Sequence, residues 1–379
     1  MIDMTHRGEQ IQRPIVTAAQ MQAIEMRSFD AGIPVPALME KVGGKLVQRF
    51  LATMTPAPGD RIGILVGPGH NGGDALVMAR ELWLAGYEVV WYAPLAKAKP
   101  LTQAHQRYAH HLGIPQLPTM AALADCTVVI DGLFGFGLDR PITGELAGVI
   151  NTLNAASCPV FSIDLPSGLQ TDRGEVLGTA VRATHTVCLG LWKRAFVQAA
   201  ALDWVGTTEL LDVGLPWADV VAELGDRPSV QRLTPAVYQA GLPLPRPRAS
   251  HKYQNGHLLI VAGSQPYRGA VILAGLAARA SGVGMVTLAV PASISPSVAQ
   301  ALPEALVRPC AETSTGTIAQ LPPDLDLTRY DAIAIGPGLT PTPVNVVDQV
   351  LAQPTPVIVD ADGLNTVSYT HLRAHETRR

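Results

Sequence analysis

Three turns rich in glycine or acidic residues, each directly after a short apolar run, constrain the fold of this chain most strongly. They are GPGHNGGDA at 67–75, DGLFGFGLDR at 131–140 and DLPSG at 164–168. Apolar runs that end in such turns are typical of buried strands in a parallel sheet. The carboxyl ends of the strands in a doubly wound sheet open onto one crevice, so the polar side chains of the turns are expected to converge there. The candidate site residues are Asn71, Asp74, Asp131, Asp164 and Ser167.

The length and patterning of the chain predict two α/β domains. The chain has 379 residues, more than one hydrophobic core usually organises. Strand-like runs recur in the first part of the chain, at 62–66, 87–93, 127–130, 160–163, 186–189 and 208–211. We therefore expect a first domain at 1–225, a stiff Pro-rich linker and domain entry at 226–250, and a second α/β domain at 251–367.

Composition excludes several classes of partner. The chain is 47% hydrophobic and carries a formal net charge of -3, with no Lys/Arg run interleaved with aromatics, which argues against nucleic acid. Its first residues lack the apolar core of a signal peptide, and the apolar run at 269–278 is too short to span a bilayer. The chain has four cysteines and no C-x-x-C pair, so we expect its cysteines to be reduced thiols. We expect a cytoplasmic protein with a small-molecule substrate and no membrane partner.

Two helices are expected before the first strand. Thr17 and Gln20 fit a capping box, which predicts a short amphipathic helix, and a second helix is expected at about 37–51. We expect these helices to flank the sheet or an oligomer interface, which leaves a homo-oligomer open. Gly86 is expected to end the helix that follows the first turn.

The glycines of the first turn have two interpretations. Gly67, Gly69, Gly72 and Gly73 would let backbone amides approach an anion such as a pyrophosphate at the start of the next helix. Glycines also gather where the chain must simply reverse tightly. The turn does not have the GxGxxG spacing.

The polar residues of the three turns suggest two kinds of chemistry. Asn71, Asp131 and Ser167 offer only oxygen ligands with one formal charge, which fits a weakly held monovalent cation better than zinc. Asp164, at a strand end, is expected to accept a proton or to bind a ribose hydroxyl, with a helix N-cap as the alternative.

Longer segments resemble two known families. GPGHNGGDALVMAREL, DGLFGFGLDRPITG and DLPSGLQTDRG together resemble the YjeF N-terminal family, the NAD(P)H-hydrate epimerases, over roughly residues 17–220. HKYQNGHLLIVAGS, YRGAVILAGLAARASGVG, IAIGPGL and VIVDADGLN resemble the YjeF C-terminal family, the ADP-dependent NAD(P)H-hydrate dehydratases. Their order is that of the bifunctional repair enzymes. The resemblance implies a Rossmann-like doubly wound parallel sheet followed by a ribokinase-like α/β domain.

The resemblance also implies a substrate and its contacts. NADHX and NADPHX are nicotinamide nucleotides whose reduced ring has taken up water at C6; an epimerase interconverts the R and S forms, and a dehydratase uses ADP to remove water from the S form. The implied hydrate contacts are His70, Asn71, Gly72, Gly73, Asp74, Gly135, Phe136, Gly137, Leu138, Asp139, Arg140, Pro141 and Asp164 in the first domain, and Ala270 and Gly338 in the second. The implied K⁺ ligands are Asn71, Asp131 and Ser167.

The chain departs from the family pattern at two places. His70 stands where the family usually has Asn, which keeps a hydrogen-bonding side chain and adds pH dependence. The later LTPHPGE-like, KG and GSGD segments of the dehydratases have no counterpart before residue 379, so we expect a truncated second domain without dehydratase activity. Residues 368–379 are expected to be a non-native tail, in which His371 and His375 have metal-ligand spacing but no supporting carboxylate.

Two other functions stay open at this point. The second half shares its predicted fold with small-molecule kinases, although the HKY and DADGLN segments favour a dehydratase. A nucleotide-binding module without turnover is the non-enzymatic alternative, which the altered His70 keeps open.

Overall fold

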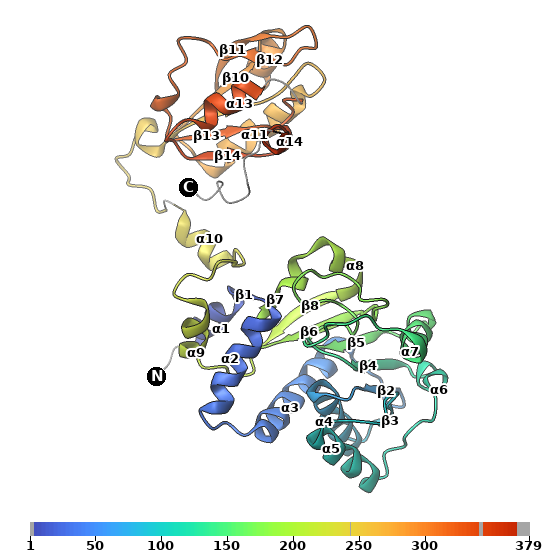
Figure 1. The fold of residues 1–379 in the computed structure, drawn as a ribbon. Helices are drawn as coiled ribbons and strands as arrows, with labels where there is room; N and C mark the ends of the chain where they lie inside the picture. The colour runs from blue at the N-terminus through green and yellow to red at the C-terminus, as the bar shows by residue number, and fades with distance from the viewer. Residues whose placement is uncertain (1–3, 243, 341–343, 370–379) are drawn as a thin grey trace. The chain divides into compact units, whose positions relative to one another are not determined.

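The chain forms two compact units, each with its own sheet (Figure 1). The computed structural model describes residues 4–242, 244–340 and 344–369. The first unit is Met1–Leu242 and the second is Pro243–Arg379. The domain limits expected from the sequence, with a linker at 226–250, stay a prediction.

The first unit contains a six-stranded sheet in which every neighbouring pair is parallel. Its strands, in spatial order, are β3 (Glu88–Tyr92), β2 (Arg61–Val66), β4 (Val128–Gly132), β5 (Val160–Ile163), β6 (His185–Leu189) and β8 (Thr207–Leu211). Only β3 lies on one side of β2, and the later strands lie on the other. The order therefore switches direction between β2 and β4, which is where ligands bind in sheets of this kind. The predicted doubly wound α/β fold is confirmed.

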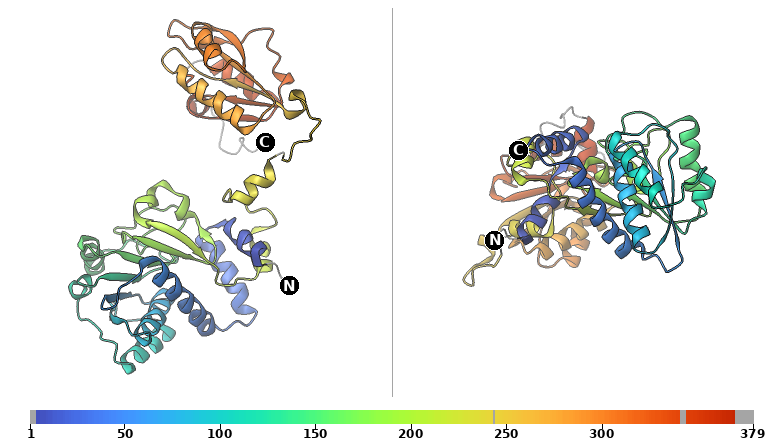
Figure 2. Two further views of the ribbon diagram at one scale, coloured as in Figure 1. Left: turned by 180° about the vertical axis from the view of Figure 1, so that it is seen from behind. Right: turned by 90° about the horizontal axis from the view of Figure 1, so that it is seen from below.

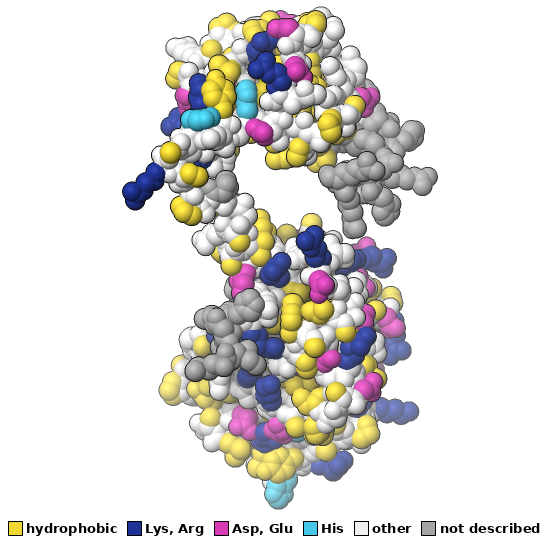
Figure 3. Space-filling view, turned by 90° about the vertical axis from the view of Figure 1, so that its left-hand side faces the viewer, with side chains coloured by type: hydrophobic (Ala, Val, Ile, Leu, Met, Phe, Trp, Pro, Cys, Tyr) yellow, Lys and Arg dark blue, Asp and Glu magenta, His cyan; other side chains and the backbone are white. Residues whose placement is uncertain are grey.

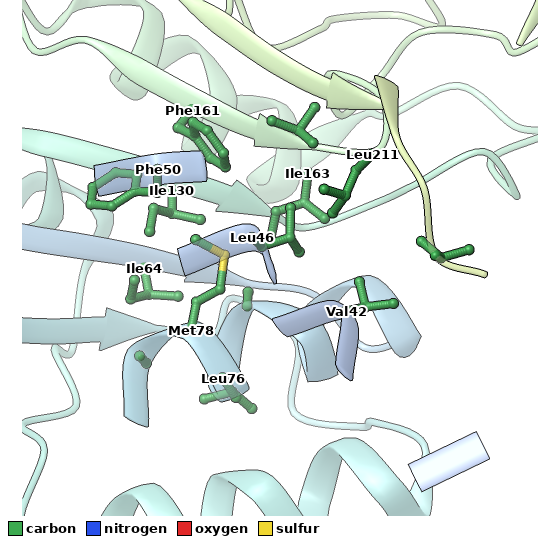
Figure 4. Close-up of a cluster of buried hydrophobic side chains, with 14 of the residues drawn as sticks. Val42, Leu46, Phe50, Ile64, Leu76, Met78, Ile130, Phe161, Ile163 and Leu211 are labelled. Carbon is green, nitrogen blue, oxygen red and sulfur yellow. The ribbon is translucent and has the colours of Figure 1, made fainter. Parts of the chain in front are cut away.

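Helices cover both faces of this sheet, as the apolar strands require (Figures 1 and 2). One face packs against α2 (Ala18–Asp30), α3 (Val35–Met54), α4 (His70–Leu84) and α5 (Pro100–His111), the other against α6 (Met120–Ala124) and α7 (Gly144–Ala155). Figure 4 shows the first of these cores, where the Phe50 and Phe161 rings meet edge to face with centroids 5.4 Å apart. Burying such a side chain contributes about 1.5–3 kcal/mol to stability.

Local sequence signals explain where several helices begin and end. The predicted capping box is confirmed: Thr17 Oγ1 accepts from Gln20 N, and Gln20 Oε1 accepts from Thr17 N, at the start of α2. The helix expected at 37–51 is α3. Gly86 follows the end of α4 with φ of +90°, a left-handed conformation that glycine adopts without strain.

A two-stranded parallel ladder joins the start of the first unit to its later part. β1 (Ile15–Val16) pairs with β7 (Trp192–Lys193). Part of the predicted linker also lies on this unit: Ile15 N donates to Val230 O at 3.1 Å, and Gln231 bridges to Pro14. The remaining helices are α1 (Met4–Gln12), α8 (Leu202–Val205), α9 (Trp217–Leu224) and α10 (Pro235–Gly241).

The second unit repeats the same architecture with one antiparallel edge. Its strands, in spatial order, are β12 (Ile318–Gln320), β11 (Leu306–Glu312), β10 (Met285–Pro291), β9 (His257–Val261), β13 (Ala332–Ile335) and β14 (Val357–Val359). All pairs are parallel except β11 with β12. The helices are α11 (Arg268–Ser281), α12 (Ser295–Ala301), α13 (Val344–Leu351) and α14 (Asp362–Tyr369). The order switches between β9 and β13, which confirms the predicted second α/β unit.

The structure confirms some of the sequence expectations and adds elements that were not expected. The strands predicted for the first unit are present, but β11 of the second unit was not predicted, because Arg308 and Pro309 interrupt the apolar residues of its LVRPCAE sequence. His371 and His375 lie outside the described residues.

No described helix combines the length and apolarity needed to cross a bilayer. On the face shown in Figure 3, Lys and Arg side chains are interspersed with Asp and Glu.

Candidate active site

A cavity of about 620 Å³ lies in the first unit at the carboxyl ends of its central strands. It brings together predicted site residues from all three turns: His70, Asn71, Asp74, Gly135, Phe136, Gly137, Leu138, Asp139, Arg140 and Asp164. The predicted Gly72, Gly73, Asp131, Pro141 and Ser167 do not line it. Helices α2 and α3, expected to flank the sheet or an oligomer interface, supply part of the cavity wall.

Glycines of the first two turns allow the backbones to touch directly. A Cβ on Gly67 would lie 1.7 Å from Leu133 O, and one on Gly72 would lie 2.0 Å from Gly67 O. A Cβ on Gly73 would meet the Met39 side chain at 2.6 Å. Of the four glycines of the first turn, only Gly69 has open space around its Cβ position. The tight-packing interpretation therefore accounts for Gly67, Gly72 and Gly73, whereas Gly69, at the start of α4, stays open to an anion.

Asp131 and Ser167 join the second turn to the third beneath the cavity. Ser167 Oγ donates to Asp131 Oδ1 at 2.6 Å, and Ser167 N donates to Asp131 Oδ2 at 2.9 Å. Ser162 Oγ and Leu133 N complete four hydrogen bonds to a carboxyl group that has no exposed surface. Burial raises the pKa of Asp131, and the hydrogen bonds from Ser167 oppose that shift. Through these hydrogen bonds, Asp131 and Ser167 hold the second and third turns together.

Asp164 lines the cavity with its carboxyl group held by three donors. Lys193 Nζ lies 2.5 Å from Asp164 Oδ1, Leu189 N donates to the same oxygen at 3.2 Å, and Phe136 N donates to Oδ2 at 3.0 Å. The Asp164 backbone has φ of +68°, a strained conformation for a residue with a side chain. Gly135 fits between Asp164 and Asn71, since a Cβ there would lie 3.0 Å from Asp164 Oδ2 and 3.5 Å from Asn71 Oδ1.

Lys193 is a site residue that the sequence did not reveal. Its side chain is fully buried, and its Nζ also donates to Leu189 O at 2.5 Å. Burial works against its charge, but the field of Asp164 prevails and raises the pKa of Lys193. The only sequence signal is a lysine that ends the apolar run TVCLGLW at 186–192.

Glu25 is a second residue that sequence analysis missed. It lies on α2 directly after the buried Ile24 and lines the cavity with Asp74 of α4. Burial raises the pKa of Glu25 to about 7, against the opposing charge of Lys193 and with a smaller push from Asp164. Burial also raises the pKa of Asp74 well above its usual range, with Asp164 and Glu25 adding to the shift. The signal available in the sequence was a carboxylate beside the apolar stripe of an amphipathic helix.

Basic groups also line the cavity. His70, Lys99 and Arg140 line it, and burial, followed by the charge of Lys99, lowers the pKa of His70. The first residue of α4 is His70, and its N-cap Gly69 has no side chain to satisfy the helix amides. Basic side chains and an uncapped helix start therefore accompany the carboxyl groups around one cavity.

The two predicted residues of the second unit lie side by side. A Cβ on Gly338 would lie 2.8 Å from Ala270 Cβ and 3.0 Å from Tyr267 O, so the turn after β13 packs on the start of α11. Close by in sequence, after β9, the Ser264 hydroxyl is buried without a hydrogen-bond partner. The described residues of both units contain no cluster of three or more His, Cys, Asp or Glu that could hold a metal ion.

Comparison with known proteins identifies the family of the whole chain. Residues 35–195 match the family described as YjeF-related protein N-terminus, and residues 258–379 match the NAD(P)H-hydrate dehydratase family. The bifunctional NAD(P)H-hydrate repair enzyme Nnr of Synechocystis sp. is 52% identical over 360 residues, which cover 95% of this chain and 68% of that protein. The chain belongs to the bifunctional NAD(P)H-hydrate repair enzyme family.

Two further similar proteins are a second repair enzyme and a solved structure. The Nnr enzyme of Thermosynechococcus vestitus is 48% identical over 354 residues, which cover 93% of this chain and 70% of that protein. A crystal structure of the ADP/ATP-dependent NAD(P)H-hydrate dehydratase of Bacillus subtilis, co-crystallized with ATP and Mg²⁺, is 38% identical and covers 35% of this chain and 46% of that one, with a TM-score of 0.29. The family resemblance seen in the sequence motifs is confirmed, and it favours an isomerase and lyase family over a small-molecule kinase.

Proposed function

We propose that the first unit interconverts the R and S forms of NADHX and NADPHX in the cavity between its three turns. The observation that carries this proposal is that Glu25, Asp74 and Asp164 line one cavity within the epimerase-like part of the chain, with Asp164 paired to the buried Lys193. The cavity volume falls in the usual range of small-molecule sites, about 300–1,000 Å³. Ionisable groups with shifted pKa values in such a cavity are typical of catalytic sites.

The substrate would lie with its two ends in different surroundings. The hydrated ring would lie near the carboxyl groups, in contact with Asp164 and with residues of the turns at 70–74 and 135–141. The pyrophosphate would lie near Gly69, where the amides at the start of α4 and the nearby Lys99 favour negative charge. His70, in place of the usual Asn, would face the same end.

We infer that K⁺ binds at Asn71, Asp131 and Ser167. These side chains offer only oxygen ligands and one formal charge, which suits a monovalent cation. Ser167 Oγ accepts a hydrogen bond from Phe134 N at 2.8 Å, which leaves its second lone pair for the cation. The amide nitrogen of Asn71 is buried and has no hydrogen-bond partner. Rotating the Asn71 amide by half a turn would put its oxygen in the place of this nitrogen and offer a ligand to K⁺. A bound K⁺ would supply positive charge that draws the three turns together.

For the second unit we infer the role of the dehydratase family, with ADP as its nucleotide. Ala270 and Gly338 would contact the S hydrate, and their direct packing in the structure supports a shared surface for one ligand. The cytoplasmic location and a homo-oligomer stay predictions.

The decisive experiment measures R and S hydrates by chiral chromatography after incubation with the purified chain. We expect an S-enriched sample to reach the R/S equilibrium far faster than without protein, and faster in KCl than in NaCl of equal ionic strength. Asp131→Ala should slow this reaction by disconnecting the turns, whereas the exposed Asp125→Ala just before β4 should not. An unchanged S fraction would refute the function; equal rates in KCl and NaCl would refute only the K⁺ site.

A further inference from the structure

Two carboxyl groups in the cavity of the first unit have no partner. Glu25 of α2 and Asp74 of α4 both line the cavity, and neither makes a hydrogen bond or ion pair with its side chain among the described residues. Asp74 is only 9% exposed. The third carboxyl group, Asp164, is instead held by Lys193 and two backbone amides. The structure therefore separates one anchored carboxylate from two that are available to a ligand.

We propose that Glu25 and Asp74 are the acid–base pair that moves protons on the substrate in this cavity. The Asp164–Lys193 ion pair is then a fixed charge that positions the ring rather than the group that exchanges a proton. This inference rests on the proposed epimerase function, since it assigns residues to that same reaction.

The surroundings of the two carboxyl groups separate their protonation states. Burial raises the pKa of Glu25 to about 7, so Glu25 exchanges its proton near neutral pH, whereas burial raises the pKa of Asp74 well above its usual range and favours its protonated form. Paired groups whose surroundings push their pKa values apart divide the roles of base and acid. The charged groups that face Glu25 across the cavity are Asp74, Asp164 and Lys193, and those elsewhere in the cavity wall are His70, Lys99, Asp139 and Arg140.

An acid–base pair can epimerise the hydrate by opening its ring. C6 carries a hydroxyl and is bonded to the ring nitrogen, so its configuration is lost when the C6–N bond breaks. The Glu25 carboxylate takes the proton of the C6 hydroxyl, and the electron pair of that O–H bond forms the C6=O double bond. The C6–N bond breaks, and its electron pair goes to the nitrogen. The nitrogen then takes the proton of Asp74. After rotation about the C5–C6 bond, the nitrogen adds to the other face of the carbonyl. Both protons then return, so atoms and charges balance without a co-reactant.

The test compares pH profiles of R/S equilibration for four chains. In the wild type, kcat is expected to rise through about pH 7 as Glu25 ionises. Glu25→Gln should lower kcat about 10²–10⁴-fold with little change in KM, and should remove this rise. Glu25→Asp keeps a carboxyl group and should recover part of the rate together with the pH dependence. Asp30→Asn, which removes an exposed carboxylate from the same helix outside the cavity wall, should match the wild type.

Two further results decide the assignment. Asp74→Asn should also lower kcat by orders of magnitude, whereas Asp164→Asn should keep the rise near pH 7 even if its rate is lower. Wild-type kcat and an unchanged pH profile in Glu25→Gln would overturn the pair, as would loss of the rise in Asp164→Asn alone. If the wild type itself fails to equilibrate the hydrates, the proposed function fails first, so the two failures are distinct.

Discussion

The two units share an architecture and differ in what they place at the equivalent crevice. In the first unit, the switch point between β2 and β4 opens onto three carboxyl groups and a buried lysine. In the second, the switch point between β9 and β13 is bordered by small and hydroxyl-bearing residues, among them Ser264, Ala270 and Gly338. The same sheet topology therefore positions three carboxyl groups and a buried lysine in one unit, and small or hydroxyl-bearing residues in the other.

This difference shows that topology decides where a site lies, whereas side chains decide its chemistry. Close backbone packing between neighbouring turns occurs in both units: a Cβ on Gly67 would lie 1.7 Å from Leu133 O, and one on Gly336, after β13, would lie 1.8 Å from Asp360 O, after β14. In both units these glycines let neighbouring turns touch. The buried charges are particular to the first crevice, and they should dominate its energetics.

The largest expected effect tests the buried ion pair. Lys193→Met leaves the Asp164 charge buried without its cation, which should lower the free energy of unfolding by about 3–5 kcal/mol. All five tryptophans lie in the first unit, so urea unfolding followed by tryptophan fluorescence reports on that unit.

Two controls sharpen this test. Lys193→Met combined with Asp164→Asn removes both charges and should recover much of the loss. Arg49→Met, which breaks the more exposed pair with Glu209, should cost less than about 1 kcal/mol. A Lys193→Met chain as stable as the wild type would contradict the charged character of this crevice.

A smaller effect depends on pH. The pKa of Glu25 rises on folding from 4.5 to about 7, so the native state holds a proton that the unfolded state releases, and stability falls as pH rises across that window. Glu25→Gln should therefore gain up to about 3 kcal/mol of stability above pH 7 and nothing below about pH 4. Urea unfolding at pH 4 and pH 8 measures this, with Asp30→Asn as control. Equal gains at both pH values would show that Glu25 does not carry the shift.

The smallest expected effect lies in the second unit. Ser264→Ala removes a buried hydroxyl that has no partner, and should stabilise that unit by about 1 kcal/mol. Hydrogen exchange of peptides from β9 and β13 measures the gain, while the tryptophan transition of the first unit should stay unchanged. Faster exchange in the variant would mean that the hydroxyl has a stabilising partner in solution.

The sequence allowed much of the fold and part of the site to be predicted. The strand-and-turn pattern located β2, β4 and β5, and with them the turns that carry Asn71, Asp74 and Asp164. It also gave the capping box of α2. It did not give β11, whose apolar residues are interrupted by Arg308 and Pro309, nor the burial of Asp131 and Ser167.

The sequence by itself determined the two α/β units, the order of their turns and the family, because apolar periodicity and turn chemistry are local properties. Only the tertiary structure brought Glu25 of α2 and Lys193 of β7 to Asp164, since these residues are far apart in the chain and lie outside the turn motifs. Their ionisation states depend on burial and on one another's charge. These charges act on one another only in the folded chain, so the shifts in pKa could not be predicted from any short segment of the sequence.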